Sequence, residues 1–173
     1  MDFTIRAATP EDCKDISRMI IELADYEKMS DQVKISHEVL KQDGFCQNPF
    51  YHCLIAEVPE EHKTKDGHVK VGYGLFFYTY STWKGRCVYL EDLYVMPEFR
   101  GKGIGKALMS SVARVGKEQQ CARLQLSVLD WNTPSMDFYI AKGAQNLTKS
   151  EGWHFLRFDG EALDKLAEEA PKK

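Results

Sequence analysis

The groups best suited to chemistry in this chain lie between Val88 and Leu108, in the stretch VYLEDLYVMPEFRGKGIGKAL. Two acids, Glu91 and Asp92, interrupt a run of β-branched, aromatic and aliphatic residues that is typical of a buried strand. A carboxylate in such a strand is costly unless it is paired or used. From the residues alone, Glu91 is either a base that accepts a proton from a substrate or a strand-edge acid paired with a lysine.

A glycine-rich loop follows the acids. Residues 100–105 read Arg-Gly-Lys-Gly-Ile-Gly and lead into Ile104, Leu108, Val112 and Val115, which are spaced as one helical face. A strand, a glycine loop and a helix N-terminus in this order predict an anion site, because the exposed N–H groups of the first helical turn point at the anion. The loop alone is also compatible with a plain tight turn. Its spacing matches neither the P-loop nor the dinucleotide-binding motif.

The elements that position these residues can be read from periodicity and from helix-capping residues. Strands are predicted over residues 3–7, 50–58, 71–80, 86–95, 123–129 and 153–159. Helices are predicted from Thr9, from Ser36, over residues 103–119, from Asn132 to Gly143 and around residues 163–167. Consecutive strands joined by turns indicate an antiparallel meander, whereas the strand–helix–strand order over residues 86–129 indicates parallel pairing. The expected fold is therefore α/β, with a mixed, twisted central sheet flanked by helices.

Length and composition limit the possible classes of protein. The 173 residues predict one domain over residues 1–173, with a core at about 3–167. The net charge of −3 argues against nucleic acid as the partner and suits a cationic small molecule. We expect no membrane span and no signal peptide. The five cysteines include no Cys-x-x-Cys pair, which indicates reduced thiols and a cytoplasmic location, and the scattered histidines predict no metal site.

Arg100, Gly103 and Gly105 form the pattern Arg-x-x-Gly-x-Gly, which resembles the pyrophosphate loop of the GNAT acetyltransferase superfamily. Residues 48–53, 89–92, 131–132 and 151–153 resemble the diamine acetyltransferase branch, and the resemblance covers nearly the whole chain. Ser81 stands where the polyamine-acetylating members carry aspartate, and Lys84 adds a positive charge. Both features, together with residues 129–132, favour the members that acetylate thialysine, because they weaken attraction for a long polycation.

The resemblance implies a GNAT fold, acetyl-coenzyme A as cosubstrate and no metal. In that family, two strands separate at their ends and the pantetheine arm of the cofactor lies between them. The implied cofactor-binding residues are Leu93, Tyr94, Val95, Arg100, Gly101, Lys102, Gly103, Ile104, Gly105, Lys106, Asn132, Thr133, Pro134 and Ser135.

The resemblance also implies roles in catalysis. Glu91 corresponds to the base that accepts the amine proton, and Tyr139 to the acid that protonates the departing thiolate. From its helical position alone, Tyr139 reads as a core residue with a satisfied hydroxyl. The implied substrate-binding residues are Tyr26, Glu27, Glu91, Asp92, Gln125, Leu126, Ser127 and Glu151. Without the resemblance, Glu27 reads as a solvated acid at a helix end, and Asp92 has the structural alternative of a buried acid satisfied by backbone donors.

The expected activity is acetyl transfer to a primary amine of a small cationic substrate, such as the ε-amine of thialysine, by direct attack in a ternary complex. Members of this branch work as homodimers, so a homodimer is expected. Three alternatives stay open at this point: a spermidine/spermine N1-acetyltransferase, an enzyme that modifies protein amines, and a non-catalytic acetyl-coenzyme A-binding module. The last predicts loss of the base or the acid, whereas Glu91 and Tyr139 are both present.

Overall fold

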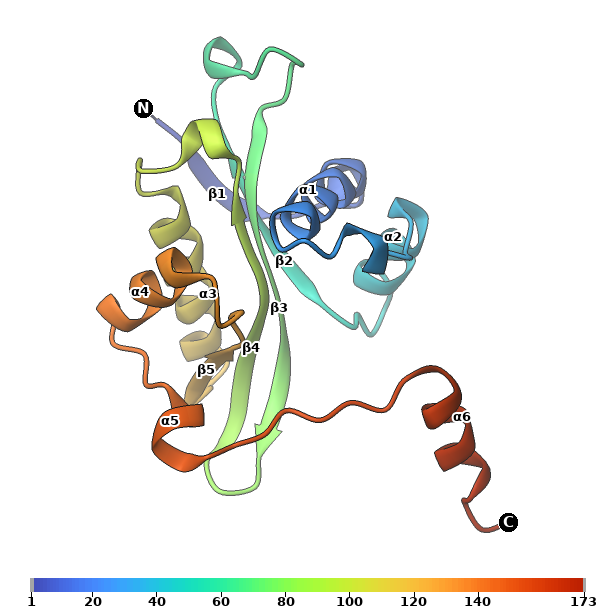
Figure 1. Ribbon diagram of the computed structural model, residues 1–173. Coiled ribbons are helices and arrows are strands. Elements are labelled where there is room, and N and C mark those ends of the chain that lie inside the picture. The colour runs from blue at the N-terminus through green and yellow to red at the C-terminus, as the bar shows by residue number, and fades with distance from the viewer. Residues whose placement is uncertain (1, 173) are drawn as a thin grey trace. The chain divides into compact units, whose positions relative to one another are not determined.

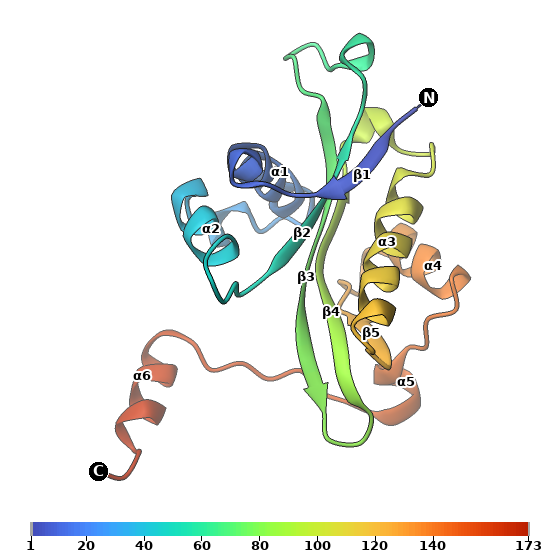
Figure 2. The ribbon, with the colours of Figure 1, turned by 180° about the vertical axis from the view of Figure 1, so that it is seen from behind.

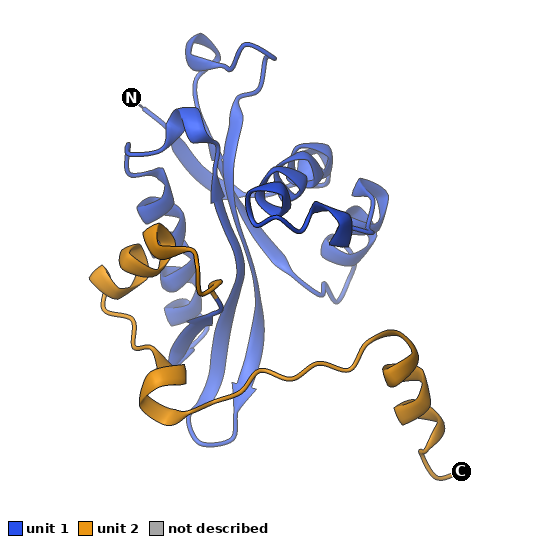
Figure 3. Cartoon of the chain, viewed as in Figure 1, with its two compact units in different colours: residues 1–127 blue, residues 128–173 orange. Residues whose placement is uncertain are grey.

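The computed structural model describes residues 2–172, which form two compact units, residues 2–127 and residues 128–172 (Figure 3). The prediction that residues 1–173 form a single domain stays a prediction. None of the helices in this described part is both long enough and apolar enough to cross a bilayer.

The first unit is built on a five-stranded sheet with the order β1-β2-β3-β4-β5 (Figure 1). Neighbouring strands from β1 to β4 pair antiparallel, and β4 pairs with β5 in parallel. The prediction of a mixed sheet that joins a meander to a parallel pair is confirmed. The strands are β1 (Thr4–Ala7), β2 (His52–Glu57), β3 (Lys70–Ser81), β4 (Gly85–Val95) and β5 (Arg123–Leu126).

Helices cover both faces of this sheet. Helices α1 (Cys13–Tyr26) and α2 (His37–Gly44) lie on one face, and α3 (Ile104–Glu118) lies on the other (Figures 1 and 2). Short 3-10 turns lie in the connections between elements: η1 (Pro10–Asp12), η2 (Ser30–Gln32), η3 (Glu60–His62) and η4 (Pro97–Phe99). The helix predicted from Thr9 therefore begins as a 3-10 turn, with the Thr9 N–H donating to the Asp12 carboxylate at 2.7 Å.

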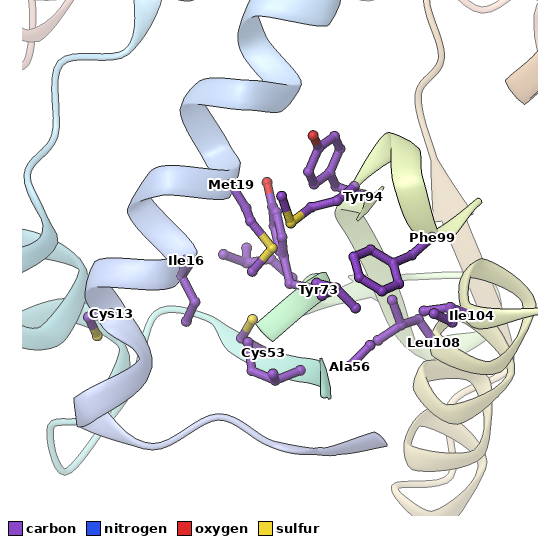
Figure 4. Packing of buried hydrophobic residues seen from close by; sticks show 14 of the residues in the cluster. Cys13, Ile16, Met19, Cys53, Ala56, Tyr73, Tyr94, Phe99, Ile104 and Leu108 are labelled. Atoms are coloured by element: carbon purple, nitrogen blue, oxygen red, sulfur yellow. The ribbon is translucent and has the colours of Figure 1, made fainter. Parts of the chain in front are cut away.

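The core fills the space between the sheet and the helices. Tyr73 and Tyr94 bring their rings to 6.2 Å beside Met19 of α1, while Ile104 and Leu108 pack from α3 (Figure 4). Gly72 of β3 has no room for a side chain between the backbone of β4 and helix α3. A Cβ there would stand 2.9 Å from the carbonyl oxygen of Tyr94 and 3.2 Å from Leu108.

The second unit consists of α4 (Thr133–Ala141), α5 (Leu147–Glu151) and α6 (Gly160–Glu168). The predicted helices after Asn132 and around residues 163–167 are confirmed, and Gly143 takes a positive φ of 102° just after α4. The predicted strand over residues 153–159 is wrong, because this segment has no regular structure. Its alternating pattern suits a strand, but a strand also needs a hydrogen-bonded neighbour, and none pairs with it among the described residues. Helix α5 was not predicted.

Candidate active site

A β-bulge in β4 isolates Glu91 from the regular ladder. Leu75 of β3 stands opposite Asp92, but the next residue, Phe76, stands opposite Leu90. One residue of β4, Glu91, is therefore extra, and its side chain is exposed. A bulge bends its strand and re-aims the side chains beside it. The two adjacent acids thus have different positions: Glu91 on the bulge and Asp92 back in register.

Strand β4 has a partner on both sides for only part of its length. Its pairing with β5 ends at Leu90 and Leu126, whereas its pairing with β3 continues to Val95. Strand β5 is also shorter than the predicted 123–129. The backbone of the predicted pantetheine-binding residues Leu93, Tyr94 and Val95 therefore has no β5 partner. Such an edge can pair with an extended ligand as with an added strand.

The glycine loop leads directly into α3, the helix that the sequence predicted after it. Gly101 and Gly103 take positive φ angles of 77° and 85°, and nothing lies within 4 Å of a Cβ built on either of them. Helix α3 starts directly afterwards, so the N–H groups of its first turn have no side-chain cap at Gly103. Lys102 and Lys106 are exposed beside this turn. An open backbone cradle with two cations suits a pyrophosphate.

Arg100 connects the loop to the strand and to α1. Its Nε donates to the carbonyl oxygen of Val95 at 2.8 Å. Its guanidinium carbon lies 5.5 Å from the centre of the Tyr26 ring and 5.7 Å from that of Tyr94, both within cation–π range. The predicted cofactor residue Arg100 thus contacts Tyr26, which was predicted to bind the substrate.

Three predicted substrate-binding acids form a cluster at the end of α1. Burial raises the pKa of Glu27, and the charges of Asp92 and Glu91 raise it further. Burial also raises the pKa of Asp92, against the hydrogen bond that the Tyr73 hydroxyl donates to Asp92 Oδ2 at 2.8 Å. Glu27 is therefore not the solvated helix-end acid that the sequence alone favoured. Like charges in a partly buried site attract a cation.

A second group of polar side chains lies on the face of the sheet that also carries Asp92 of the acidic cluster. Leu124 and Leu126 of β5 pack against the cluster beneath α3, so Gln125, which alternates with them, faces the other way. Gln125 stands in register with Tyr89. The hydroxyl of Tyr89 lies 2.7 Å from Ser127 Oγ.

Sequence reasoning missed Tyr73 and Tyr89. The sequence placed Tyr73 and Tyr89 in predicted strands but gave no further signal for either. Their hydrogen-bond partners, Asp92 and Ser127, follow only from the way the strands pair. Leu126 was predicted to bind the substrate, but its side chain packs towards the buried cluster that contains Val112.

The remaining predicted site residues belong to the second unit. The Asn132 side chain accepts the N–H of Ser135 at 3.4 Å and so caps α4 as predicted. Thr133 and Pro134 form the exposed first turn of this helix. Tyr139 lies on α4, where its ring packs edge-on against Phe138 at 5.4 Å. Glu151 ends α5 and accepts the indole N–H of Trp153 at 2.8 Å.

The first unit thus combines an anion cradle, an open strand edge and an acidic cluster. The cradle and the strand edge fit acetyl-coenzyme A, whose pyrophosphate needs N–H donors and whose amide-containing arm needs a strand edge, whereas the acidic cluster suits a cation. Among residues 2–172, no group of three His, Cys, Asp or Glu side chains is arranged to hold a metal ion. All five cysteines are free thiols.

Known proteins resemble the chain in sequence. Thialysine N-epsilon-acetyltransferase of Bos taurus is 56% identical over 163 residues, covering 94% of this chain and 96% of that protein. Spermidine/spermine N(1)-acetyltransferase-like protein 1 of Homo sapiens is 39% identical, over 95% of this chain and 24% of its own length.

The fold has solved counterparts too. An integron cassette protein from V. cholerae superposes with a TM-score of 0.73 at 26% identity, covering 96% of this chain and 98% of that one. The sequence profile of the acetyltransferase (GNAT) family matches residues 19–143. The predictions of a GNAT fold and of an N-acetyltransferase are therefore confirmed, and this chain belongs to the acetyltransferase (GNAT) family.

Proposed function

We propose that this enzyme transfers the acetyl group of acetyl-coenzyme A to the ε-amine of thialysine or a closely related lysine analogue. The observation that carries the proposal is the acidic cluster of Glu27, Glu91 and Asp92 beside the open edge of β4. A cationic amine held by this cluster would lie next to the strand edge that suits the cofactor arm. The 56% identity to a thialysine N-epsilon-acetyltransferase supports the choice of amine.

Glu91 is the proposed base. An amine with a lysine-like pKa of ~10.4 must lose a proton before it can attack, which costs about 4.6 kcal/mol at pH 7. Glu91 is exposed on the bulge, so it can take this proton directly or through one water molecule. Asp92 and Glu27 hold the ammonium form nearby, and the Tyr73 hydroxyl holds Asp92 in place.

Acetyl-coenzyme A supplies the thioester carbonyl carbon to which the neutral amine forms a C–N bond as the C–S bond breaks. Backbone N–H groups of the bulged strand β4 are the proposed donors to the carbonyl oxygen. Tyr139 is the proposed donor of the proton that the departing sulfur requires. The nitrogen loses two protons on the way from ammonium to amide, one to Glu91 before the attack and one after it. One of the two replaces the proton that Tyr139 gives to the sulfur, and the other is released to water.

The loop and the two helix N-termini hold the cofactor in this proposal. The backbone of residues 101–106 binds the pyrophosphate, Leu93 to Val95 bind the pantetheine arm, and Asn132 to Ser135 add further contacts. Tyr26, Gln125, Ser127 and Glu151 are the proposed residues of the amine site. We further infer a homodimer that works in the cytoplasm as a single acetyltransferase domain.

A second candidate is spermidine/spermine N1-acetylation. It is favoured by the 39% identity to a human protein named for that activity. The acidic cluster would attract a polyamine as well as a lysine analogue. Against this candidate, Ser81 and Lys84 supply no negative charge for the far end of a polycation.

The test is a comparison of kcat/KM for thialysine, lysine and spermidine under identical conditions. A preference for thialysine over spermidine of at least tenfold, about 1.4 kcal/mol of transition-state discrimination, is the expected result. A preference for spermidine would support the second candidate. Acetyl-coenzyme A binding without turnover of any of the three amines would overturn both.

A further inference from the structure

Arg123 lies on the same face of the sheet as the acidic cluster. It alternates with Leu124, which packs towards α3, so its side chain projects from the opposite face, as Gln125 does. Its contact agrees with this placement, since Arg123 Nη1 lies 3.4 Å from Ser81 Oγ at the end of β3. Arg123 is exposed, and it begins β5 in register with Cys87.

The guanidinium of Arg123 has a different environment from those of Arg6 in β1 and Arg18 in α1. Arg6 and Arg18 both form ion pairs with carboxylates, at distances of 2.8 to 3.3 Å. Within the described range 2–172, no carboxylate lies within 4 Å of the Arg123 guanidinium, which donates instead to the neutral Ser81 hydroxyl. A planar fork of donors with this environment is suited to bind a carboxylate from outside the chain.

The spacing along the strands suits a lysine analogue. Glu91 lies four positions along β4 from Cys87, the residue in register with Arg123, which corresponds to about 13 Å at the strand rise of ~3.3 Å per residue. An extended thialysine has six bonds of about 1.5 Å between its ε-nitrogen and its carboxyl carbon, or ~7 Å end to end. The side chain of Arg123 can span the difference between these two lengths. Tyr89 and Gln125 lie in register between the two ends.

We propose that Arg123, supported by Ser81, binds the α-carboxylate of the amino-acid substrate, while the acidic cluster binds the ε-amine. This inference rests on the proposed function and makes it more specific. The enzyme then selects amines that carry a carboxylate about one lysine side chain away. A diamine has no group for Arg123 and meets a positive charge there instead.

The experiment compares two substrates that differ only in the carboxylate. Thialysine and its decarboxylated analogue, bis(2-aminoethyl) sulfide, are each assayed with the wild type and with Arg123→Gln. We expect Arg123→Gln to lower kcat/KM for thialysine about tenfold or more, mainly through KM, because a charge-assisted hydrogen bond is lost. The diamine should change by less than about twofold, or improve.

Arg86→Gln is the matched control. Arg86 lies on the neighbouring strand, but its guanidinium donates to the carbonyl oxygen of Gln119 at 3.2 Å, at the end of α3. This variant should leave the preference for thialysine unchanged. Arg123→Lys, which keeps the charge, should restore part of the affinity, and acetyl-coenzyme A binding by calorimetry should be equal in all variants.

The outcomes separate the two levels of the proposal. An equal change for both substrates in Arg123→Gln, or no change for thialysine, would overturn the role of Arg123 and leave the proposed function intact. If Arg123→Gln does not fold, a wild type that acetylates the diamine as well as thialysine would overturn it too. A wild type that does not acetylate thialysine at all would instead overturn the proposed function.

Discussion

Two groups of carboxylates in the first unit differ in how their charge is compensated. The group around Asp12 is paired with cations, whereas the cluster of Glu27, Glu91 and Asp92 places acids beside other acids. Asp12, whose side chain is 1% exposed, is paired at 2.8 Å with both Arg6 and Lys70. Burial would raise the pKa of Asp12, but the hydrogen bonds from these cations and from the Thr9 N–H hold it well below its usual range. Burial raises the pKa of Glu27 and Asp92, and neighbouring carboxylates add to the shift of Glu27.

The difference separates a structural acid from the cluster that we propose binds the amine. Asp12 is fully compensated within the protein, so its charge stabilises the fold. The ionised forms of Glu27 and Asp92 cost stability at neutral pH, because their pKa values are raised. A protein keeps such a cost where the charge is used, and a cationic substrate can provide the missing compensation.

Glu91→Gln should give the largest effect on activity. Loss of the base should lower kcat by about 10²- to 10⁴-fold. The free energy of unfolding in urea should stay within about 0.5 kcal/mol of the wild type, because Glu91 is exposed. Steady-state kinetics and denaturation check both parts. Full activity in this variant would remove Glu91 from the mechanism and with it much of the contrast between the clusters.

Tyr139→Phe tests a group that belongs to neither cluster. We expect turnover to fall by roughly 10²-fold, the scale of general-acid catalysis, with acetyl-coenzyme A affinity nearly intact. Tyr80→Phe is a control, since it also removes one tyrosine hydroxyl but lies exposed near the end of β3, and its turnover should match the wild type. Unchanged turnover in Tyr139→Phe would exclude it as the acid.

Asp12→Asn should have the largest effect on stability. It leaves Arg6 and Lys70 without their buried partner, at a cost of about 3 kcal/mol; partial exposure of both cations keeps the loss near the low end for a buried pair. Chemical denaturation at pH 7 measures the loss. Because the pKa of Asp12 is lowered by folding, its contribution is present above the unfolded value of ~3.9 and should vanish as the pH falls below it.

Asp92→Asn should not destabilise the protein by more than about 1 kcal/mol, and can stabilise it. The amide still accepts the Tyr73 hydroxyl but no longer carries a buried charge. The sign of the pH dependence is opposite to that of Asp12: because folding raises the pKa of Asp92, stability rises as the pH falls from 7 towards 4. Unfolding free energies over this range should show a smaller rise in the variant. A loss like that of Asp12→Asn would contradict the comparison.

Arg100→Lys should have the smallest effect. Arg100 packs on the ring of Tyr94, whose hydroxyl donates to Glu22. Glu22 belongs to an ion-pair network with Arg18, Asp15 and Lys70, so the ring is already held in place without Arg100.

The lysine loses the Nε hydrogen bond to Val95 and part of the ring contact, or about 1 kcal/mol. Acetyl-coenzyme A affinity should fall about fivefold, and Arg114→Lys on the exposed side of α3 should change nothing. Equal affinities for both variants would show that Arg100 is not part of the cofactor site.

Much of this architecture could be predicted because its signals are local. Thr9, Asn132 and Gly143 mark helix ends through capping chemistry, and the glycine loop requires positive φ angles that few other residues adopt. The strand predicted over residues 153–159 was wrong for the opposite reason. Alternation is a property of one segment, whereas strand formation depends on a hydrogen-bonded partner elsewhere in the chain.

The site depended on information that no single segment contains. The sequence placed two acids in one strand, but the bulge at Glu91 follows from the register between β3 and β4. The hydrogen bond between Tyr73 and Asp92 spans 19 residues and needs the same register. Glu27 changed from a solvated acid to a partly buried one because the end of α1 lies near Asp92 and Glu91.

The most direct test of the difference between the two clusters is kcat/KM for thialysine in Asp12→Asn and Asp92→Asn, each corrected for its folded fraction. We predict a value within about twofold of the wild type for Asp12→Asn and a loss of at least about tenfold for Asp92→Asn. Equal losses in the two variants, or a loss confined to Asp12→Asn, would contradict the assignment of the Glu27, Glu91 and Asp92 cluster to the amine.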